Sequence, residues 1–581
     1  MVRLSDVVPF GQVTAVHGSY ARIGLRVPEE ARISDGRVTV GGFVSIRCTA
    51  STLIAMITEV ARDNAGGAVI ASADFLGEIS HDGQRLRFQR GVTSYPMIGD
   101  TVEPTTQDEL HAVYAPSGKT QIDVGQLQQD ASVTAYVDVE EMLSKHFALL
   151  GSTGVGKSSG VSLLLNEVLK ARPELRIFLL DVHNEYGRCF GDKAQVLTPR
   201  NLKLPFWLFN FEEIVDVLFG RRPGVPEELE ILTEVIPIAK SLYARFQTTG
   251  RIAPRTEETA VDYALDAPVP YRLADLIGQI DARMGKLENR STRMVYHKLI
   301  SRIETVRNDP RYAFMFDNAN LGGDTMAEVI SQLFRLPARG RPMTIMQLAG
   351  FPVEVVDSVV SVVCRMAFDF GLWSDGASPL LFVCEEAHRY ASADRGAGFG
   401  PTRKAVSRIA KEGRKYGVFL GLVTQRPAEL DATIISQCST LFAMRLANER
   451  DQALLRSAVS DAAANLLSFL PSLGTREVLA FGEGVALPTR LRFKTVPADQ
   501  LPRGEASIAS LASASREHDL DFIRSVVERW RGASKHRDLT GETGGGAFAE
   551  RMRDAAAHPP LLQPSQGLDP DRFQLLKKPL R

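Results

Sequence analysis

The sequence contains few cysteines, and they follow no pattern of a disulfide framework or a metal site. Only five occur in 581 residues, and they are widely scattered. None forms a Cys-x-x-Cys pair, and no His-rich neighbourhood accompanies them. We therefore expect reduced thiols, as in a cytosolic protein. The five are Cys48, Cys189, Cys364, Cys384 and Cys438.

Long apolar runs are also missing. No stretch reaches the roughly 18 consecutive apolar residues of a membrane-spanning helix. The longest candidate, residues 359–373, is interrupted by Arg365 and Asp369. Residues 1–16 lack the unbroken apolar segment of a signal peptide. We therefore expect a cytoplasmic protein that makes no membrane contact.

The chain carries no surplus of one charge. Its 68 Lys and Arg residues face 69 Asp and Glu residues, which leaves a formal charge of −1. This balance excludes a uniformly basic nucleic-acid binder, so any DNA contact must come from a local patch. Hydrophobic residues make up 44% and charged residues 24% of the chain. This is ordinary usage for a folded protein, and the length predicts several domains of about 100–200 residues each.

The N-terminal residues 1–115 show the pattern of a small all-β unit. Short β-branched runs are separated by Gly, Asp and Pro signals at intervals of about 8–12 residues. This spacing predicts an antiparallel barrel or sandwich. A polar segment over residues 105–133 is expected to lead into the next domain.

The pattern changes towards a multidomain α/β protein at about residue 134. Apolar strand-like runs then alternate with helical patterns, which predicts a parallel sheet with crossover helices. Residues 211–318 contain amphipathic helical patterns instead, so we expect a helical insertion that divides the core into residues 134–210 and 319–505. Residues 506–581 are predicted to form one helix, near residues 520–531, and a proline-rich tail.

A phosphate-binding loop is the clearest motif of the chain. Residues 151–158 read GSTGVGKS and fit the pattern G-x-x-x-x-G-K-[ST] between an apolar run and a helical pattern. The alternative is a glycine-rich turn that matches by chance. In the functional interpretation, Lys157 neutralises the β- and γ-phosphates of ATP and the Ser158 hydroxyl coordinates Mg²⁺. The predicted nucleotide-binding residues are Gly151, Ser152, Thr153, Gly154, Val155, Gly156, Lys157, Ser158 and Ser159.

A pair of acids follows a second apolar run. Residues 380–386 read LLFVCEE, and a phosphate loop requires a metal-orienting acid at the end of a neighbouring strand. We interpret Glu385 as an outer-shell ligand of Mg²⁺ and Glu386 as the base or the orienter of the attacking water. The alternative is a pair of solvated acids at the start of a helix. Cys384 is expected to be a small core residue.

Two more strand ends carry candidate polar groups. Asp181 ends the run 177–180 and could hold the metal or water, with Glu185 in support, although a turn-capping aspartate is a comparable interpretation. His183 is expected to be structural. Gln425 ends the run 418–424 and is suited to sense the γ-phosphate, unless it is merely a polar strand terminus.

A basic segment lies between these motifs. Residues 389–415 carry eight basic and two acidic side chains, a local excess of six positive charges. A helix over residues 402–415 would gather four of the cations on one stripe, which could be a DNA-binding face or a solvated one. Arg414 lies off the stripe and could reach the nucleotide of a neighbouring subunit as an arginine finger. The stripe consists of Lys404, Arg408, Lys411 and Lys415.

In this order, the segments KHFALLGSTGVGKS, DVHNEYG, LLFVCEEAH, EGRKYG and VTQRP resemble the HerA/FtsK group of DNA translocases, and HerA-like ATPases in particular. The resemblance extends from the N-terminal unit to about residue 493. Position by position it implies that Glu386 is the catalytic carboxylate, Arg414 the arginine finger and Gln425 the sensor. It also implies nucleotide contacts for Lys157, Ser158 and Asp181, and Lys145 stands where some relatives carry a nucleotide-contacting arginine.

The resemblance further implies the partners and the activity. It predicts a homohexameric ATPase ring that uses ATP and Mg²⁺ and pumps double-stranded DNA through its central pore. It also predicts an effector protein, either a nuclease or a Sir2-like enzyme, docked through the N-terminal barrel in DNA-end processing or anti-phage defence. The alternative is an ATPase scaffold that assembles and gates its effector without processive movement.

Overall fold

The computed structural model of the chain describes residues 9–25, 39–62, 68–82, 85–115, 120–220, 225–249, 263–317, 323–394, 399–459, 465–502, 521, 523–524 and 527–528. Residues 1–517 belong to one compact unit and residues 518–581 to a second. In the second unit, the five described positions are helical. The predicted proline-rich tail lies outside the described residues.

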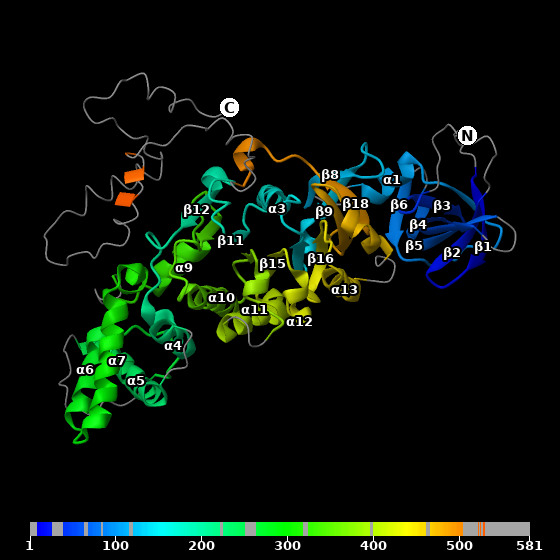
Figure 1. Cartoon of the computed structure of the whole chain (residues 1–581). Helices are drawn as coiled ribbons and strands as arrows, with labels where there is room; N and C mark the ends of the chain where they lie inside the picture. The colour runs from blue at the N-terminus through cyan, green and yellow to red at the C-terminus, as the bar shows by residue number, and fades with distance from the viewer. Residues whose placement is uncertain are drawn as a thin grey trace. The chain divides into compact units, whose positions relative to one another are not determined.

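The N-terminal strands form a closed antiparallel barrel (Figure 1). Six strands follow one another in the order β2, β1, β7, β3, β4, β5, and pairing of β2 with β5 closes the ring, while β6 extends it beyond β5. Alternating side chains such as Ile23 and Ile46 fill its core. The predicted barrel is thus confirmed. The strands are β1 Gly11–Val16, β2 Tyr20–Leu25, β3 Phe43–Arg47, β4 Thr52–Arg62, β5 Val69–Asp82, β6 Arg85–Arg90 and β7 Thr101–Pro104.

The stretch expected to be a polar connection, residues 105–133, contains two regular elements. Helix α1, Gln107–Tyr114, begins with a capping box between Thr106 and Glu109. Strand β8, Gln121–Leu127, pairs with a strand close to the C-terminal end of the core. Because this partner is distant in sequence, nothing in the local pattern of residues 105–133 indicates the pairing.

The core is one eleven-stranded sheet with the order β12-β13-β11-β14-β15-β10-β16-β17-β18-β8-β9. The first seven strands of this order are parallel, and the remaining pairings are antiparallel. The central strands are continuous apolar runs because helices cover both faces of the sheet. The predicted α/β class is confirmed. The strands not yet given are β9 Thr134–Asp138, β10 His146–Leu150, β11 Arg176–Asp181, β12 Ala194–Leu197, β13 Met343–Gln347, β14 Leu380–Cys384, β15 Val418–Thr424, β16 Cys438–Ala443, β17 Glu477–Gly482 and β18 Thr489–Phe493.

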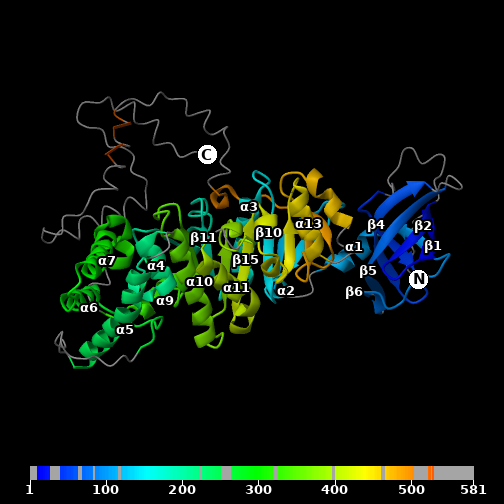
Figure 2. The ribbon, with the colours of Figure 1, turned by 60° about the horizontal axis from the view of Figure 1, so that its bottom comes forward.

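Helices of the core connect these strands (Figure 2). Helix α10 contains the longest apolar stretch of the sequence and is almost entirely buried. In the described part of the chain, no helix is both long enough and apolar enough to span a membrane. All five cysteines are free thiols. The core helices are α2 Val139–Met142, α3 Lys157–Ala171, α9 Met326–Phe334, α10 Val356–Trp373, α11 Gly400–Glu412, α12 Ala432–Ile435 and α13 Glu449–Ala458.

The described part of residues 211–317 contains helices joined by turns and non-helical segments such as residues 263–272, and it contains no strand. Helices α5, α6 and α7 pack together, and a partly buried ion pair joins α4 to α10, because Arg365 Nη2 lies 2.9 Å from Glu213 Oε2. This pair explains how α10 accommodates an arginine in its apolar sequence. The helices are α4 Phe211–Phe219, α5 Pro226–Thr249, α6 Leu273–Gly285, α7 Arg290–Asn308 and α8 Ala313–Phe316.

Candidate nucleotide-binding site

The phosphate-binding loop connects the end of β10 to the start of α3. The left-handed backbone of Gly156 (φ 95°) caps the helix N-terminus, a conformation that favours glycine. Lys157 begins the helix and is 8% exposed. Backbone N–H groups at a helix N-terminus form a binding site for phosphate. Sequence and structure therefore agree on this loop.

Neighbouring strands hold the loop in place. The Gly151 amide donates to Thr424 O at 3.2 Å, and both the amide and the hydroxyl of Ser152 donate to Arg445 O at 3.0 Å. On the other side, the amide of Arg476 donates to Val155 O at 2.9 Å. The loop is thus fixed by the last residue of β15, by a residue that follows β16 and by one that precedes β17, which pre-organises it for a ligand.

Glu386 follows β14 and faces the loop lysine. Its Oε1 lies 3.9 Å from Lys157 Nζ and 3.9 Å from His183 Nε2, while Oε2 lies 3.3 Å from His388 Nδ1. The backbone of Glu386 is left-handed, with φ 48°. Such a conformation in a non-glycine residue costs free energy and is often found at functional sites. The predicted catalytic carboxylate and the phosphate-binding lysine are thus neighbours.

The Glu386 carboxylate has spare hydrogen-bonding capacity. Among the described residues, no donor satisfies its buried Oε2, which has contact with His388 but not hydrogen-bond geometry. His388 Nδ1 instead lies 3.0 Å from Thr424 Oγ1, and burial lowers the pKa of His388. A buried acceptor without a partner is costly unless a ligand or water satisfies it. This oxygen is therefore suited to accept a hydrogen bond from a water molecule.

Glu385 points in another direction and is bound by protein donors. Its Oε1 accepts from the Tyr186 hydroxyl at 3.0 Å, and its Oε2 accepts from the Val182 amide at 3.3 Å. The Tyr186 hydroxyl is also hydrogen-bonded to Ser158. Burial, together with the nearby Asp181, raises the pKa of Glu385 to about 8. The two adjacent acids therefore have different environments, and Glu385 is connected to the predicted magnesium-binding serine through a tyrosine.

The raised pKa of Glu385 makes stability depend on pH. Between its ordinary value of 4.5 and about 8, the folded protein keeps a proton that the unfolded chain releases, so stability decreases as pH rises. The melting temperature of Glu385→Gln should therefore fall less between pH 5 and pH 8 than that of the native protein. Both are measured without nucleotide or Mg²⁺. The exposed Glu174→Gln serves as control. Parallel pH profiles for Glu385→Gln and the native protein would contradict this assignment.

Asp181 and Gln425 lie at the same sheet edge as the loop. The Asp181 carboxylate accepts from the amides of Glu185 and Tyr186, at 2.9 and 3.1 Å, and burial raises its pKa. These bonds are those of the turn-capping alternative, and a metal contact of Asp181 stays a prediction. Gln425 Oε1 accepts from the Thr153 hydroxyl at 2.5 Å, so Gln425 contacts the phosphate-binding loop directly.

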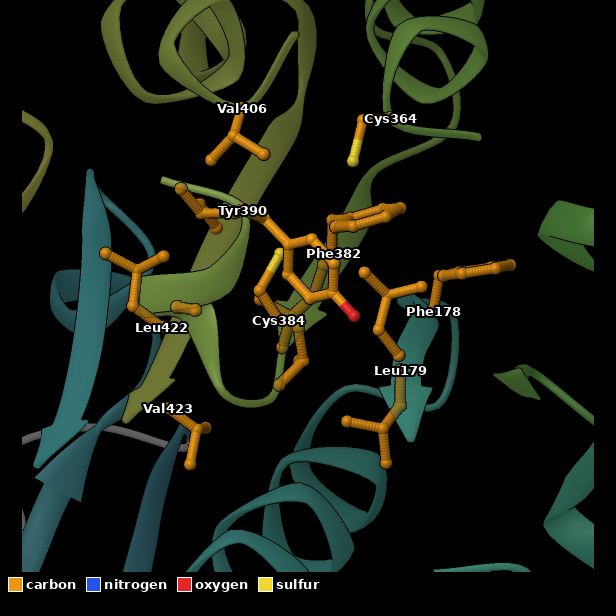
Figure 3. Close-up of a cluster of buried hydrophobic side chains, with 14 of the residues drawn as sticks. Phe178, Leu179, Cys364, Phe382, Cys384, Tyr390, Val406, Leu422 and Val423 are labelled. Atoms are coloured by element: carbon orange, nitrogen blue, oxygen red, sulfur yellow. The ribbon is translucent and has the colours of Figure 1, made fainter. Parts of the chain in front are cut away.

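An apolar cluster supports the acid pair from behind. Figure 3 shows Tyr390, just after the turn that carries Glu386, packed near Phe382 and Cys384 of β14. Phe382 stacks on Phe178 of β11 at 5.1 Å between ring centroids. Cys384 is fully buried, which confirms its expected core position. Such packing restricts β14 and so fixes where Glu385 and Glu386 emerge.

Lys145 and Arg414 lie at the opposite edge of the sheet. Lys145 precedes β10, and its Nζ lies 3.2 Å from Glu483 Oε1. Arg414 is exposed in a 3₁₀ turn (η6, Gly413–Tyr416) that precedes β15, the parallel neighbour of β10. A strand of five residues is roughly 17 Å long. Both residues are therefore separated from the phosphate-binding loop of their own chain, which follows the other end of β10.

The basic stripe differs from its expected form. Lys404 Nζ lies 3.2 Å from Glu212 Oε1, and Arg408 pairs with Asp369 at 3.2 Å while its guanidinium lies 4.0 Å from the Phe368 ring centroid. Helix α11 also ends at Glu412, and the 3₁₀ turn Gly413–Tyr416 follows it. Gly413 lies so close to the Val418 carbonyl that a Cβ would be 2.5 Å from its oxygen. Only two of the four predicted cations therefore lack an ion pair in the described structure. These are Lys411 and Lys415.

The residues of this site fit ATP with Mg²⁺. The glycine loop offers backbone donors, Lys157 lies at its base, and Glu386 Oε2 is an unsatisfied buried acceptor. In the described part of the chain, no cluster of three or more His, Cys, Asp or Glu residues could hold a metal alone. This agrees with Mg²⁺ sites in which substrate phosphates and water supply most ligands. Ser158 would supply the protein ligand.

Several neighbours of the site were not assigned from the sequence. His183 was expected to be structural but lies beside Glu386, and His388 and Tyr186 stand within the motifs without an assigned role. Arg445 and Arg476 contact the loop through their backbones. Both histidines follow strand ends at the same sheet edge as the loop, and this position was the one sequence signal that could have assigned them to the site. The two arginines follow or precede strands that the sequence interpretation did not identify.

Comparisons with known proteins show which proteins this chain is similar to. Residues 122–367 match the family described as the central domain of helicase HerA. A probable helicase of Methanocaldococcus jannaschii is 27% identical over 383 residues, which cover 64% of this chain and 66% of that protein. The DNA double-strand break repair helicase HerA of Pyrococcus furiosus is 25% identical over 428 residues, or 68% of this chain and 72% of that protein. Among solved structures, VirB4 of Thermoanaerobacter pseudethanolicus is 16% identical with a TM-score of 0.41, covering 65% of this chain and 97% of that one.

Proposed function

We propose, from the premise that this chain belongs to the HerA-like P-loop ATPases, that it couples ATP hydrolysis to movement along double-stranded DNA. The observation that carries the proposal is the pairing of Glu386 with Lys157 at 3.9 Å beside a pre-organised phosphate-binding loop. Relatives named as DNA double-strand break repair helicases support DNA as the substrate.

The hydrolytic step uses residues from three strand ends. Glu386 orients the attacking water and accepts its proton through the carboxylate, while Lys157 stabilises charge on the γ-phosphate. Ser158 would hold Mg²⁺, which would supply positive charge against the phosphates of bound ATP. Gln425, in contact with Thr153 of the loop, is suited to detect loss of the γ-phosphate and to pass this change to β15.

We further propose that the active site is completed between subunits of a homohexamer. Arg414 and Lys145 are at the sheet edge away from their own loop, and Arg414 is exposed without an ion pair in the described structure. In a ring, head-to-tail contacts bring one edge of each subunit against the opposite edge of its neighbour. Arg414 of one subunit can then serve as the finger for the nucleotide of the next, with Lys145 close by.

The test of a DNA motor begins with ATP turnover. Duplex DNA should stimulate hydrolysis by the full chain, because a motor releases products faster when its track is bound. Stimulation should depend on duplex length and should be absent in Lys157→Ala. Turnover that is unaffected by duplex DNA of any length would contradict the proposal.

An effector protein, either a nuclease or a Sir2-like enzyme, is the proposed partner of the N-terminal barrel. The barrel core is built from apolar side chains such as Ile23 and Ile46, and none of the barrel residues that the structure describes belongs to the nucleotide-binding site described above. The second candidate function is an ATPase scaffold that gates such an effector. Effector activity that requires ring assembly, with no displacement of obstacles from DNA, would favour the scaffold over the motor.

A further inference from the structure

Helix α7 of the helical insertion is strongly basic. It carries five Lys and Arg residues and one acid, Glu304, in a chain whose formal charge is −1. Such a local excess is the electrostatic pattern of a surface that binds an anion, unless nearby acids neutralise it.

The basic side chains gather on the exposed side of the helix. Arg290, Arg293, His297 and Lys298 are all exposed, whereas Leu299 and Ile303 on the other side are buried. Helical periodicity places residues separated by three or four positions on one face. We call these four exposed residues the α7 stripe. The whole helix spans about 27 Å, at about 1.5 Å per residue, which corresponds to roughly eight base pairs of duplex DNA.

The α7 stripe is not neutralised within the described structure. No described carboxylate lies within 4.0 Å of Arg290, Arg293 or Lys298, although Arg293 Nε donates to Leu287 O at 2.6 Å. This differs from α11, where Lys404 and Arg408 both have acidic partners. Glu304 is the one acid of α7 itself. The positive charge of the stripe is therefore free to attract an external partner.

A surface groove runs beside the stripe. It has a volume of about 440 Å³ and is lined by Lys298, Arg302, Ser301, Thr305 and His297 of α7, with Leu218 and Val306 as apolar wall. Arg302 is held in place, since its guanidinium lies 4.5 Å from the Phe219 ring centroid and its Nε 3.4 Å from Glu228 Oε2. None of the described residues that line this groove carries a carboxylate. Cations and hydroxyl groups are the donors that recognise phosphate oxygens.

We propose that the α7 stripe and its groove bind the phosphate backbone of double-stranded DNA, as a contact separate from the nucleotide site. The inference rests on the proposed function. Lys298 and Arg290 neutralise phosphates, and the hydroxyl of Ser301 donates a hydrogen bond inside the groove. Because phosphate contacts carry no sequence information directly, the contact is independent of DNA sequence.

The experiment measures binding of the full chain to a fluorescent 30-base-pair duplex over a range of salt concentrations. A non-hydrolysable ATP analogue is present throughout. The salt slope is the slope of the logarithm of the binding constant against the logarithm of the salt concentration. Each lost phosphate contact lowers its magnitude by about 0.9. Arg290→Gln/Lys298→Gln should therefore lose about 1.8 slope units, so that its affinity relative to the native chain changes about tenfold between 50 and 200 mM salt. ATP turnover without DNA should be unchanged. Lys170→Gln/Lys193→Gln removes the same charge from exposed positions elsewhere and should leave the slope unchanged.

Several results would overturn the inference. A native chain that binds no duplex DNA at low salt would remove the proposed function and this contact with it. Native binding with an unchanged slope in Arg290→Gln/Lys298→Gln would remove this contact alone. If light scattering shows that the variant forms a smaller assembly than the native chain, the stripe is a contact between subunits. Inorganic phosphate is the alternative ligand, and this outcome has its own signature. If the native chain binds inorganic phosphate saturably, and the variant loses this binding while its DNA binding is unchanged, the groove is a site for a small anion.

Discussion

Replacing Glu386 with glutamine should leave ATP binding intact and lower ATP hydrolysis by about 10²- to 10⁴-fold. Glutamine keeps the size of the side chain and can still occupy the position beside Lys157, His183 and His388. It cannot accept a proton from the attacking water. Binding of a fluorescent ATP analogue and steady-state phosphate release separate the two steps, and ATP should accumulate on the variant unhydrolysed.

Two variants define the specificity of this result. Lys157→Ala should lose hydrolysis by a different route, because the phosphate charge stays uncompensated and nucleotide binding weakens. Glu385→Gln changes the adjacent acid, which hydrogen-bonds to Tyr186 and Val182, and should retain much more activity than Glu386→Gln. Nearly native turnover in Glu386→Gln would exclude Glu386 as the catalytic carboxylate.

Arg414→Ala should lower hydrolysis by about 10³- to 10⁵-fold, the range measured for arginine fingers. The reason is that an exposed guanidinium ahead of β15 would stabilise the transition-state charge on a neighbouring subunit's nucleotide. The adjacent Lys415→Ala removes the same charge from the same turn and should have a small effect. This comparison separates the position of the charge from its presence.

Mixing two inactive proteins tests whether Arg414 acts between subunits. In equal mixtures of Lys157→Ala and Arg414→Ala, about a quarter of interfaces in a head-to-tail ring combine an intact loop with an intact finger. Activity should therefore reappear in the mixture, provided that co-assembly is verified by a tag on one protein. Absence of activity at every mixing ratio, despite co-assembly, would contradict an intersubunit role.

Local sequence patterns were sufficient to predict much of the site. The loop over residues 151–158 depends on glycines, a lysine and a serine at fixed spacing, all within one strand–helix junction. Strand β14 is a continuous apolar run, so its end and its two acids could be predicted as well. The barrel also follows from alternation and turn signals within residues 1–115. For the loop and β14 the determining residues lie close together in the sequence, and the strand signals of the barrel are local although pairings such as β1 with β7 are not.

Features that depend on distant partners could not be predicted. The pairing of β8 with β18 and the hydrogen bond between Tyr186 and Glu385 join separate parts of the chain. The ion pair between Lys404 and Glu212 does so too, so the sequence could indicate a stripe of four cations but not that two of them have acidic partners. A helical projection shows which side chains share a face but not what packs against that face.

Displacement of a tightly bound obstacle from DNA tests the central claim most directly. Streptavidin is bound to a biotinylated duplex, and its release is followed with the native chain and with Glu386→Gln. The account predicts release by the native chain with ATP, and none by the variant or by the native chain with a non-hydrolysable analogue. Native protein whose ATP hydrolysis is stimulated by duplex DNA, yet which never displaces streptavidin, would contradict a translocating motor.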